Sequence, residues 1–194
     1  MVAPVLWALA IVICGSLRPG YSHLTQYISE LGERGSSTEL IMRYGAFVPT
    51  GLMHVAFAGY LYFAFKGRRL AAIAATLLAL NGVARVGAGI FPCEPGCAGT
   101  GLISEKLHSL SAGAGFVALI GASVIWGILL KRFQDLRVLG LYSIASGLVG
   151  LAFLLLMAWK ADVRTATGLY ERVSSGVLSL WVLVFAVTLW RRQR

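Results

Sequence analysis

Charged residues are scarce in this sequence, and acidic residues are the scarcest of them. Only 13% of the 194 residues are charged, with 8 Asp or Glu against 17 Lys or Arg, while 58% are hydrophobic. The hydrophobic residues form long blocks rather than the short periodic stripes of a soluble domain. A bilayer core about 30 Å thick needs roughly 20 mostly apolar residues per helix. Six such blocks use up the chain, which excludes an additional soluble domain.

The sequence also lacks a basic face. Its formal net charge of +9 would suggest a nucleic-acid partner in a soluble protein, but the positive residues stand in clusters between apolar blocks. No surface for nucleic acid can be assembled from such clusters, so we expect no nucleic-acid partner. The first residues lack the basic segment of a signal peptide, and the first apolar block is therefore expected to remain as a helix.

These features predict an all-α fold. We expect one polytopic membrane helix bundle over residues 1–194, with six transmembrane helices and a short outer amphipathic helix in the first loop. The first span is the weakest, because it is at the low edge of spanning length. No internal repeat is evident. The predicted spans cover about residues 3–17, 39–65, 70–90, 105–130, 136–159 and 168–190.

The basic clusters predict the orientation of the bundle. Six spans place all of them on one side, and positive clusters in short loops stay in the cytoplasm. Of the acidic residues only Asp135 falls on that side. We therefore expect cytoplasmic N- and C-termini and outward-facing first, third and fifth loops. The clusters are Lys66, Arg68 and Arg69, then Lys131, Arg132 and Arg137, then Arg191, Arg192 and Arg194.

The first loop carries apolar residues at helical spacing. A two-turn amphipathic helix lying on the outer membrane face follows from positions i, i+3, i+4 and i+7. Its simpler alternative role is to cover the bundle as a lid. The apolar face would comprise Leu24, Tyr27, Ile28 and Leu31, and the polar side would carry His23, Gln26 and Glu30.

The third loop contains two of the three cysteines. Cys93 and Cys97 flank Pro95-Gly96, a turn that can bring their side chains together. Because this loop is expected on the oxidising side, we predict a structural disulfide. A redox-active pair is the sharper alternative. A metal site is disfavoured because two thiolates do not complete a zinc shell.

Polar residues inside the predicted spans indicate a functional site. Asn81 and Arg85 share one face of the third span, with Arg85 roughly 9 Å below its outer end at 1.5 Å per residue. A buried arginine of this kind is a functional candidate by default, although its side chain could instead extend to the interface. The candidate partners of Arg85 are Glu30, Glu94 and Glu105.

Two histidines lie within the predicted spans. His108 shares the outer rim with Arg85 and Glu105, whereas His54 is deeper and is interpreted as a packing residue. We expect an outward-opening pocket with Arg85 as its floor, suited to an anionic head group or a carboxylate. Glu171 is expected to pair with Lys160 or Arg172 at the rim. The predicted ligand-binding set is Arg85, Glu30, His23, Asn81, Glu94, Glu105 and His108.

Three stretches of sequence carry a family resemblance. Through these stretches, nearly the whole chain resembles the bacterial membrane-protein family catalogued as domain of unknown function 998. That family is itself similar in outline to the eukaryotic Frag1, DRAM and Sfk1 group of six-span proteins. Some members of this group are linked to lipid organisation or anchor remodelling. The resemblance implies a bacterial cytoplasmic (inner) membrane and roles for Glu30, Arg85, Glu94 and His108. The stretches are Tyr21-Ser22-His23 followed by Ile28-Ser29-Glu30-Leu31-Gly32, then Phe91-Pro92-Cys93-Glu94-Pro95-Gly96-Cys97, and Leu107-His108-Ser109-Leu110-Ser111.

Three functions remain open. The first is a binder of a lipid head group or small amphiphile, with membrane lipid as its partner and no cofactor. The second is an intramembrane hydrolase or transferase in which His108 acts as base on water or Ser111, oriented by Glu30 or Glu105. A three-histidine metal version is disfavoured because His54 should lie about 10 Å deeper than His23 and His108.

The third function is a proton- or ion-coupled transporter using Asn81, Arg85 and His54. No span shows the paired Gly/Pro breaks of many transporters. A chain of 194 residues would need to assemble for this purpose, so a homo-oligomer stays open.

Overall fold

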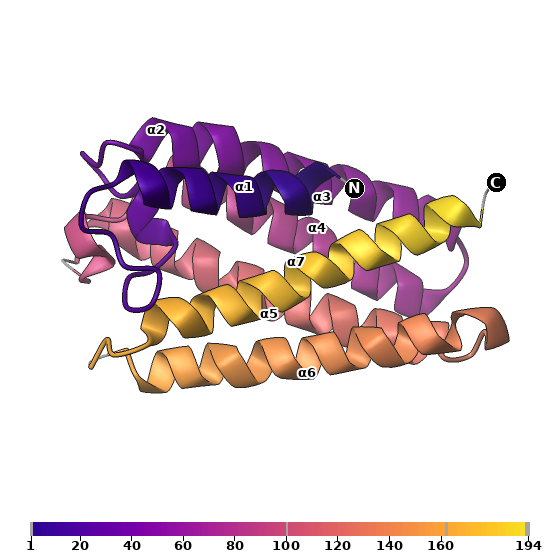
Figure 1. Cartoon of the computed structure of the whole chain (residues 1–194). Helices are drawn as coiled ribbons and strands as arrows, with labels where there is room; N and C mark the ends of the chain where they lie inside the picture. The colour runs from indigo at the N-terminus through magenta and orange to yellow at the C-terminus, as the bar shows by residue number, and fades with distance from the viewer. Residues whose placement is uncertain (1, 100, 162, 193–194) are drawn as a thin grey trace.

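The computed structural model describes residues 2–99, 101–161 and 163–192. Within these ranges the chain contains helices, turns and loops but no strand, and the long helices run side by side in one bundle (Figure 1). The helices are α1 (Val2–Leu17), α2 (Glu39–Met42), α3 (Val48–Ala64), α4 (Arg69–Ile90), α5 (Ile103–Leu130), α6 (Arg137–Trp159) and α7 (Thr167–Arg191). Short 3₁₀ helices are η1 (Ser29–Gly32), η3 (Pro95–Cys97) and η4 (Gln134–Leu136), and η2 (Arg43–Phe47) is a π-helical turn that joins α2 to α3.

Five helices are long and apolar enough to cross a membrane, by length and composition. They are 39–64, 69–90, 103–130, 134–159 and 167–191, so the second to sixth predicted segments are confirmed as long apolar helices. α1 is apolar but has only 16 residues. At 1.5 Å per residue it is about 24 Å long, and it begins partway along the bundle (Figure 1). The chain is therefore a multi-pass membrane protein, and a sixth span stays a prediction.

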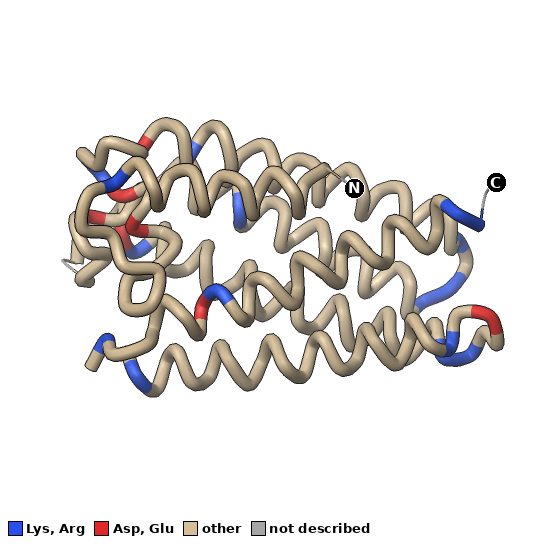
Figure 2. Tube along the Cα trace, in the orientation of Figure 1, with Lys and Arg blue, Asp and Glu red and all other residues tan. Residues whose placement is uncertain are grey.

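Charge is distributed unequally between the two ends of the bundle. The connections after α1, α4 and α6 form one end, here called the loop-rich end, and the connections after α3 and α5 meet the end of α7 at the other, here called the basic end (Figure 2). At the basic end Arg192 forms an ion pair with Asp135, and Arg68 lies over the ring of Phe133 at 4.6 Å. The basic clusters identified in the sequence thus share one end of the bundle, apart from Arg194, which lies outside the described residues.

Glycines allow neighbouring helices to approach very closely. A Cβ atom on Gly51 of α3 would lie 2.6 Å from the carbonyl oxygen of Gly82 on α4, and the reverse contact is equally short. Gly127 and Gly140 make the same kind of contact between α5 and α6. Small residues at such crossings let helix backbones pack in lipid. These crossings pack α3 against α4 and α5 against α6.

The predicted two-turn amphipathic helix in the first loop is wrong. Residues 23–26 form turns, and only η1 is helical. The backbone N–H of Tyr27 donates to the Glu30 carboxylate at 3.0 Å, and that of Ile28 donates to Glu171 at 2.6 Å. Because side-chain oxygens take these donors, the backbone does not form an α-helical ladder there. The loop folds over the end of the bundle, where Ile28 and Leu31 are buried.

Two apolar clusters leave a polar region between them. The larger cluster lies toward the basic end and includes Trp126, Trp181 and Phe185. The smaller lies toward the loop-rich end and includes Trp7 and Phe47. The polar side chains that define the candidate site lie where α1, α4, α5 and α7 meet between these clusters.

Candidate functional site

A small cavity opens among the helices toward the loop-rich end. Its volume is about 50 Å³, measured as the space open to the centre of a water molecule. Such a space holds a few waters or a small polar group. Its lining consists of Trp7, Ser29, Phe47, Asn81, Arg85, Ala88, His108, Ser111, Ala112, Gly115, Phe116, Leu119, Glu171 and Ser175.

Arg85 reaches the cavity from α4 without a carboxylate partner. Its Cζ atom lies 4.1 Å from the centre of the Trp7 ring, and Nη1 is 3.4 Å from Thr50 Oγ1. Within the described ranges, no carboxylate oxygen lies within 4.0 Å of this guanidinium. An aromatic face stabilises a cation but leaves its N–H donors available. The arrangement therefore presents a partly buried positive charge whose N–H groups can donate hydrogen bonds to a ligand.

His108 is held on α5 by two backbone carbonyls. Its Nδ1 lies 2.8 Å from Phe91 O and 3.0 Å from Ala88 O. Carbonyls only accept hydrogen bonds, so we assign the proton of the neutral imidazole to Nδ1. Nε2 then carries a lone pair, and this buried atom has no hydrogen-bond partner among the described residues. His108 thus adds a hydrogen-bond acceptor, or a base, to the lining of a cavity that also contains Arg85.

Ser111 lies one turn after His108 on the same side of α5. A Cβ on Gly87 of α4 would come within 2.7 Å of its hydroxyl oxygen, so the glycine provides the space that this hydroxyl occupies. No hydrogen bond joins Ser111 to His108 in the described chain. Asn81 completes this wall, donating from Nδ2 to the Gly115 carbonyl at 2.9 Å.

Another wall of the cavity comes from α7 and α1. Sequence reasoning placed Glu171 only at the rim, and it did not assign Trp7 or Ser175 to the site. Glu171 accepts the Ile28 backbone N–H at 2.6 Å, and Trp7 Nε1 donates to Ser175 Oγ at 2.9 Å. The ion pair expected between Glu171 and Lys160 or Arg172 does not form in the described structure. The sequence feature that could have indicated this wall is Glu171 followed by Ser175 at i+4, near the start of the last span, because such a pair shares one face of a helix.

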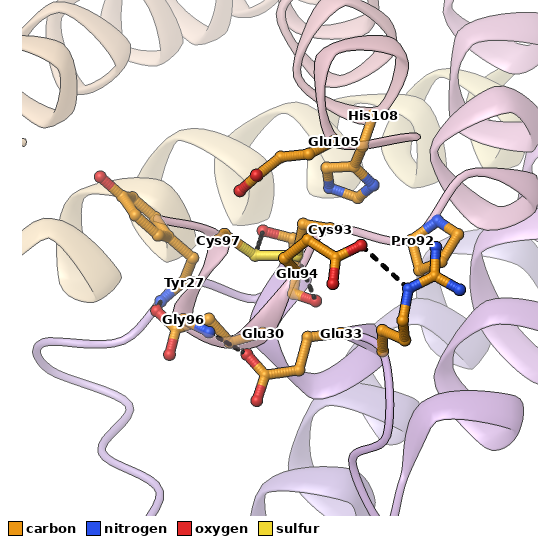
Figure 3. Close-up of a disulfide and its surroundings, with 12 residues drawn as sticks. Tyr27, Glu30, Glu33, Pro92, Cys93, Glu94, Gly96, Cys97, Glu105 and His108 are labelled. Carbon is orange, nitrogen blue, oxygen red and sulfur yellow. Dashed lines mark hydrogen bonds and ion pairs between the residues drawn. A yellow bond between two sulfur atoms is a disulfide. The ribbon is translucent and has the colours of Figure 1, made fainter. Parts of the chain in front are cut away.

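The carboxylates predicted to meet Arg85 instead hold the loops together. Glu30 is 2% exposed and accepts from Gln26 Nε2 at 2.7 Å, with Arg164 Nη1 at 3.5 Å. Glu94 pairs with Arg34 at 2.9 Å, and Glu105 accepts the Gly99 N–H at 2.8 Å. Figure 3 shows these groups around the third loop. Their predicted role toward a ligand stays a prediction.

The predicted Cys93–Cys97 disulfide is confirmed (Figure 3). Cys97 Sγ lies 3.5 Å from Ser29 Oγ, and Ser29 lines the cavity. The Phe91 carbonyl that accepts from His108 stands two residues before Cys93. The disulfide loop therefore supports both the roof of the cavity and the orientation of the imidazole.

Arg172 ties the first loop to α7 at the rim. Its Nε–H donates to His23 Nδ1 at 3.1 Å, and Nη2 donates to the Tyr21 hydroxyl. Burial raises the pKa of Tyr21 to about 12, although the Arg172 charge acts in the opposite direction. The pKa of His23 is lowered by partial burial and then by the nearby Arg172 charge. His23 is thus occupied by a loop contact at the surface.

The three histidines do not gather. His54 bonds Asn81 within the bundle, His23 bonds Arg172 at the rim, and His108 bonds the carbonyls before the third loop. In the part of the chain that the structure describes, no group of three His, Cys, Asp or Glu side chains is placed to hold a metal ion.

Comparison with known protein families finds a match over most of the chain. The model of the family described as "Protein of unknown function (DUF998)" matches residues 1–188. No curated protein and no solved structure matches the chain.

Proposed function

The chain belongs to this family of unknown function, and from the geometry of its cavity we propose that it binds the anionic group of a membrane amphiphile at Arg85. The observation that carries this proposal is a guanidinium in a buried cavity with an aromatic ring and a hydroxyl as neighbours. Among the described residues no carboxylate oxygen lies within 4.0 Å of it, although Glu171 lines the same cavity farther away. A charge placed away from water needs a counter-charge, and an anionic ligand supplies one.

The second polar group of the cavity narrows the ligand class. His108 Nε2 accepts hydrogen bonds and donates none in the tautomer assigned from its carbonyl contacts. An anion that also carries an O–H group, such as a phosphate monoester or a head group with a hydroxyl beside its charge, would satisfy both side chains. The planar guanidinium would donate hydrogen bonds to two oxygens of the anion.

The proposal includes a membrane orientation. We take the short α1 as a sixth span, with both termini cytoplasmic, and the loop-rich end as external, because the basic clusters share the other end. The Cys93–Cys97 disulfide fits an oxidising compartment such as that outside a bacterial inner membrane. Impermeant thiol labelling of single cysteines placed at Lys160 and at Arg69 tests this. Labelling at Arg69 alone from outside would overturn the orientation.

A hydrolase or transferase is the second candidate, and one observation favours it. The unpartnered Nε2 of His108 is in the position of a general base, with its other nitrogen oriented by carbonyls. Ser111 and Glu171 lie in the same lining. Transport has less support, because His54 is not part of this lining and the cavity reaches only Asn81 and Leu119 on that side.

The test is the affinity of the purified protein for a single-chain phosphate monoester, measured by native mass spectrometry. Arg85→Gln should weaken binding on the order of 10-fold or more, since hydrogen bonds to charged groups contribute about 1.5–3 kcal/mol. Arg137→Gln, an exposed arginine at the basic end, is the matched control. Equal affinities for the wild type and Arg85→Gln would reject the anion site. Turnover of an ester substrate that His108→Gln abolishes would favour the enzyme.

A further inference from the structure

A second hollow runs along the outside of the bundle between α1 and α7. Its volume is about 480 Å³ on the same measure as the cavity, and its lining is almost entirely apolar. Leu9 and Val12 on α1 border it and are 53% and 62% exposed, so it faces the surroundings of the bundle rather than its interior. In a bilayer this groove opens to lipid.

The groove and the cavity share two residues. Trp7 and Ser175 line both, and the hydrogen bond between them, at 2.9 Å, joins α1 to α7 at that point. The Trp7 ring that faces the groove is also the ring over which the Arg85 guanidinium lies. One hydrogen-bonded pair therefore separates the lipid-facing groove from the cation.

The dimensions and charge of the groove indicate its occupant. It extends along α7 from Arg172 to Leu183, about 16 Å at 1.5 Å per residue. That is close to half of a hydrocarbon core about 30 Å thick, the depth that the chains of one leaflet occupy. Arg172 places a positive charge at the loop-rich end of the groove, where the head group of a lipid in that leaflet would lie.

We propose that the groove holds one acyl chain of an anionic amphiphile, and that the Trp7–Ser175 pair is the lateral opening through which its head group reaches Arg85. This inference rests on the anion site proposed above. The amphiphile enters from the bilayer, with its chain remaining between α1 and α7 while its head group moves past Trp7. The ligand class is a lipid with one chain available to the groove and an anionic head.

Two glycines provide a matched pair of variants. A Cβ on Gly176, in the groove, meets nothing within 4 Å, and the same holds for Gly59 on α3. Gly176→Phe adds a ring in the groove from a position where the Cβ meets no neighbour, and Gly59→Phe adds the same ring on α3 from an equally open position. The probe is a single-chain phosphate monoester with a photoreactive group midway along its chain.

Gly176→Phe should weaken binding of the probe by 10-fold or more, whereas Gly59→Phe should leave it unchanged. In the wild-type protein the photoreactive group should attach to groove residues of α1 or α7. Attachment of the probe elsewhere, or wild-type affinity in Gly176→Phe, would overturn the proposal that the groove binds an acyl chain. Because the attachment site is mapped in the wild-type protein, this test holds even where a variant fails to fold. Loss of affinity in Arg85→Gln alone would leave the anion site standing without the groove. If the probe attaches to the groove but Arg85→Gln binds it with unchanged affinity, the groove would stand without the anion site at Arg85.

Discussion

His54 Nδ1 and Asn81 Oδ1 are 2.6 Å apart and buried between α3 and α4. Asn81 also donates from Nδ2 to the Gly115 carbonyl, so its oxygen is the acceptor and His54 Nδ1 is the donor. Three helices are therefore joined through one amide side chain next to the cavity. Asn81 stands one turn before Arg85, and this link fixes the helix that presents the guanidinium.

Asn81→Leu should lower the stability of the bundle. The change leaves the His54 Nδ1–H without its partner, at a cost of about 1–3 kcal/mol for a buried unsatisfied group. The Gly115 carbonyl loses its additional donor but stays within the α5 helix ladder. Reversible unfolding in detergent measures the loss. In a double-mutant cycle, His54→Leu should cost less in the Asn81→Leu background than in the wild type, and strictly additive losses would contradict the link.

Gly82→Ala should destabilise the α3–α4 crossing. The new Cβ would lie 2.6 Å from the Gly51 carbonyl oxygen, a distance that forces the helices apart. Overpacking of this kind costs about 1–3 kcal/mol. Gly59→Ala is the control, because its Cβ meets nothing and alanine favours a helix by roughly 0.5–1 kcal/mol over glycine. A loss in thermal midpoint for both variants, of equal size, would argue against the close approach as the cause.

Replacing both Cys93 and Cys97 with serine should lower stability by on the order of 2 kcal/mol, the chain-entropy estimate for a very short loop. The same change should loosen the contact of the third loop with Ser29 and the position of the Phe91 carbonyl that orients His108. Affinity for the phosphate monoester should therefore fall as well. Thermal unfolding with and without reductant checks the first point. Cys14→Ala should keep the response to reductant, whereas the double variant should have none.

Arg172→Gln should raise the pKa of His23 toward its ordinary value. The pKa is lowered first by burial and then by the Arg172 charge, and the variant removes the second cause. Nuclear magnetic resonance of labelled histidine gives the pKa directly. An unchanged or further lowered pKa would contradict the predicted effect of the Arg172 charge on His23.

The same shift predicts the direction of a pH effect on stability. The unfolded chain binds a proton at His23 more readily than the folded chain, so this residue withdraws stability as the pH falls through about 6.5. Between about pH 7.5 and about pH 5.5, a range that brackets the ordinary histidine pKa, the thermal midpoint of the wild type should fall. That of His23→Gln should fall less.

The long helices could be predicted because each apolar block carries its own signal. The segment 105–130, for example, contains enough consecutive apolar residues to indicate a span without any knowledge of its neighbours. Arg85, Asn81 and His108 were likewise identifiable from their depth in the spans, and the structure brings all three into one lining. The disulfide followed from two cysteines in one loop.

The first loop and the α7 wall could not be predicted in the same way. The spacing of Leu24, Tyr27, Ile28 and Leu31 fits a helix, but the Ile28 N–H goes to Glu171, a residue distant in the sequence. That one bond changes the backbone of the loop and also brings an acid into the cavity. Trp7 was missed for a related reason, since its contact with Arg85 depends on how α1 packs rather than on local pattern.

The short α1 has a consequence for the surrounding bilayer. A helix of 16 residues is about 24 Å long, less than a hydrocarbon core of about 30 Å. Beyond its first turn lies a hollow of about 320 Å³ bordered by Val2, His54 and Val182. Lipid tails must enter this hollow, or the membrane must become thinner beside α1, to remove the hydrophobic mismatch. With α1 as the sixth span proposed above, we therefore expect the protein to prefer thin membranes.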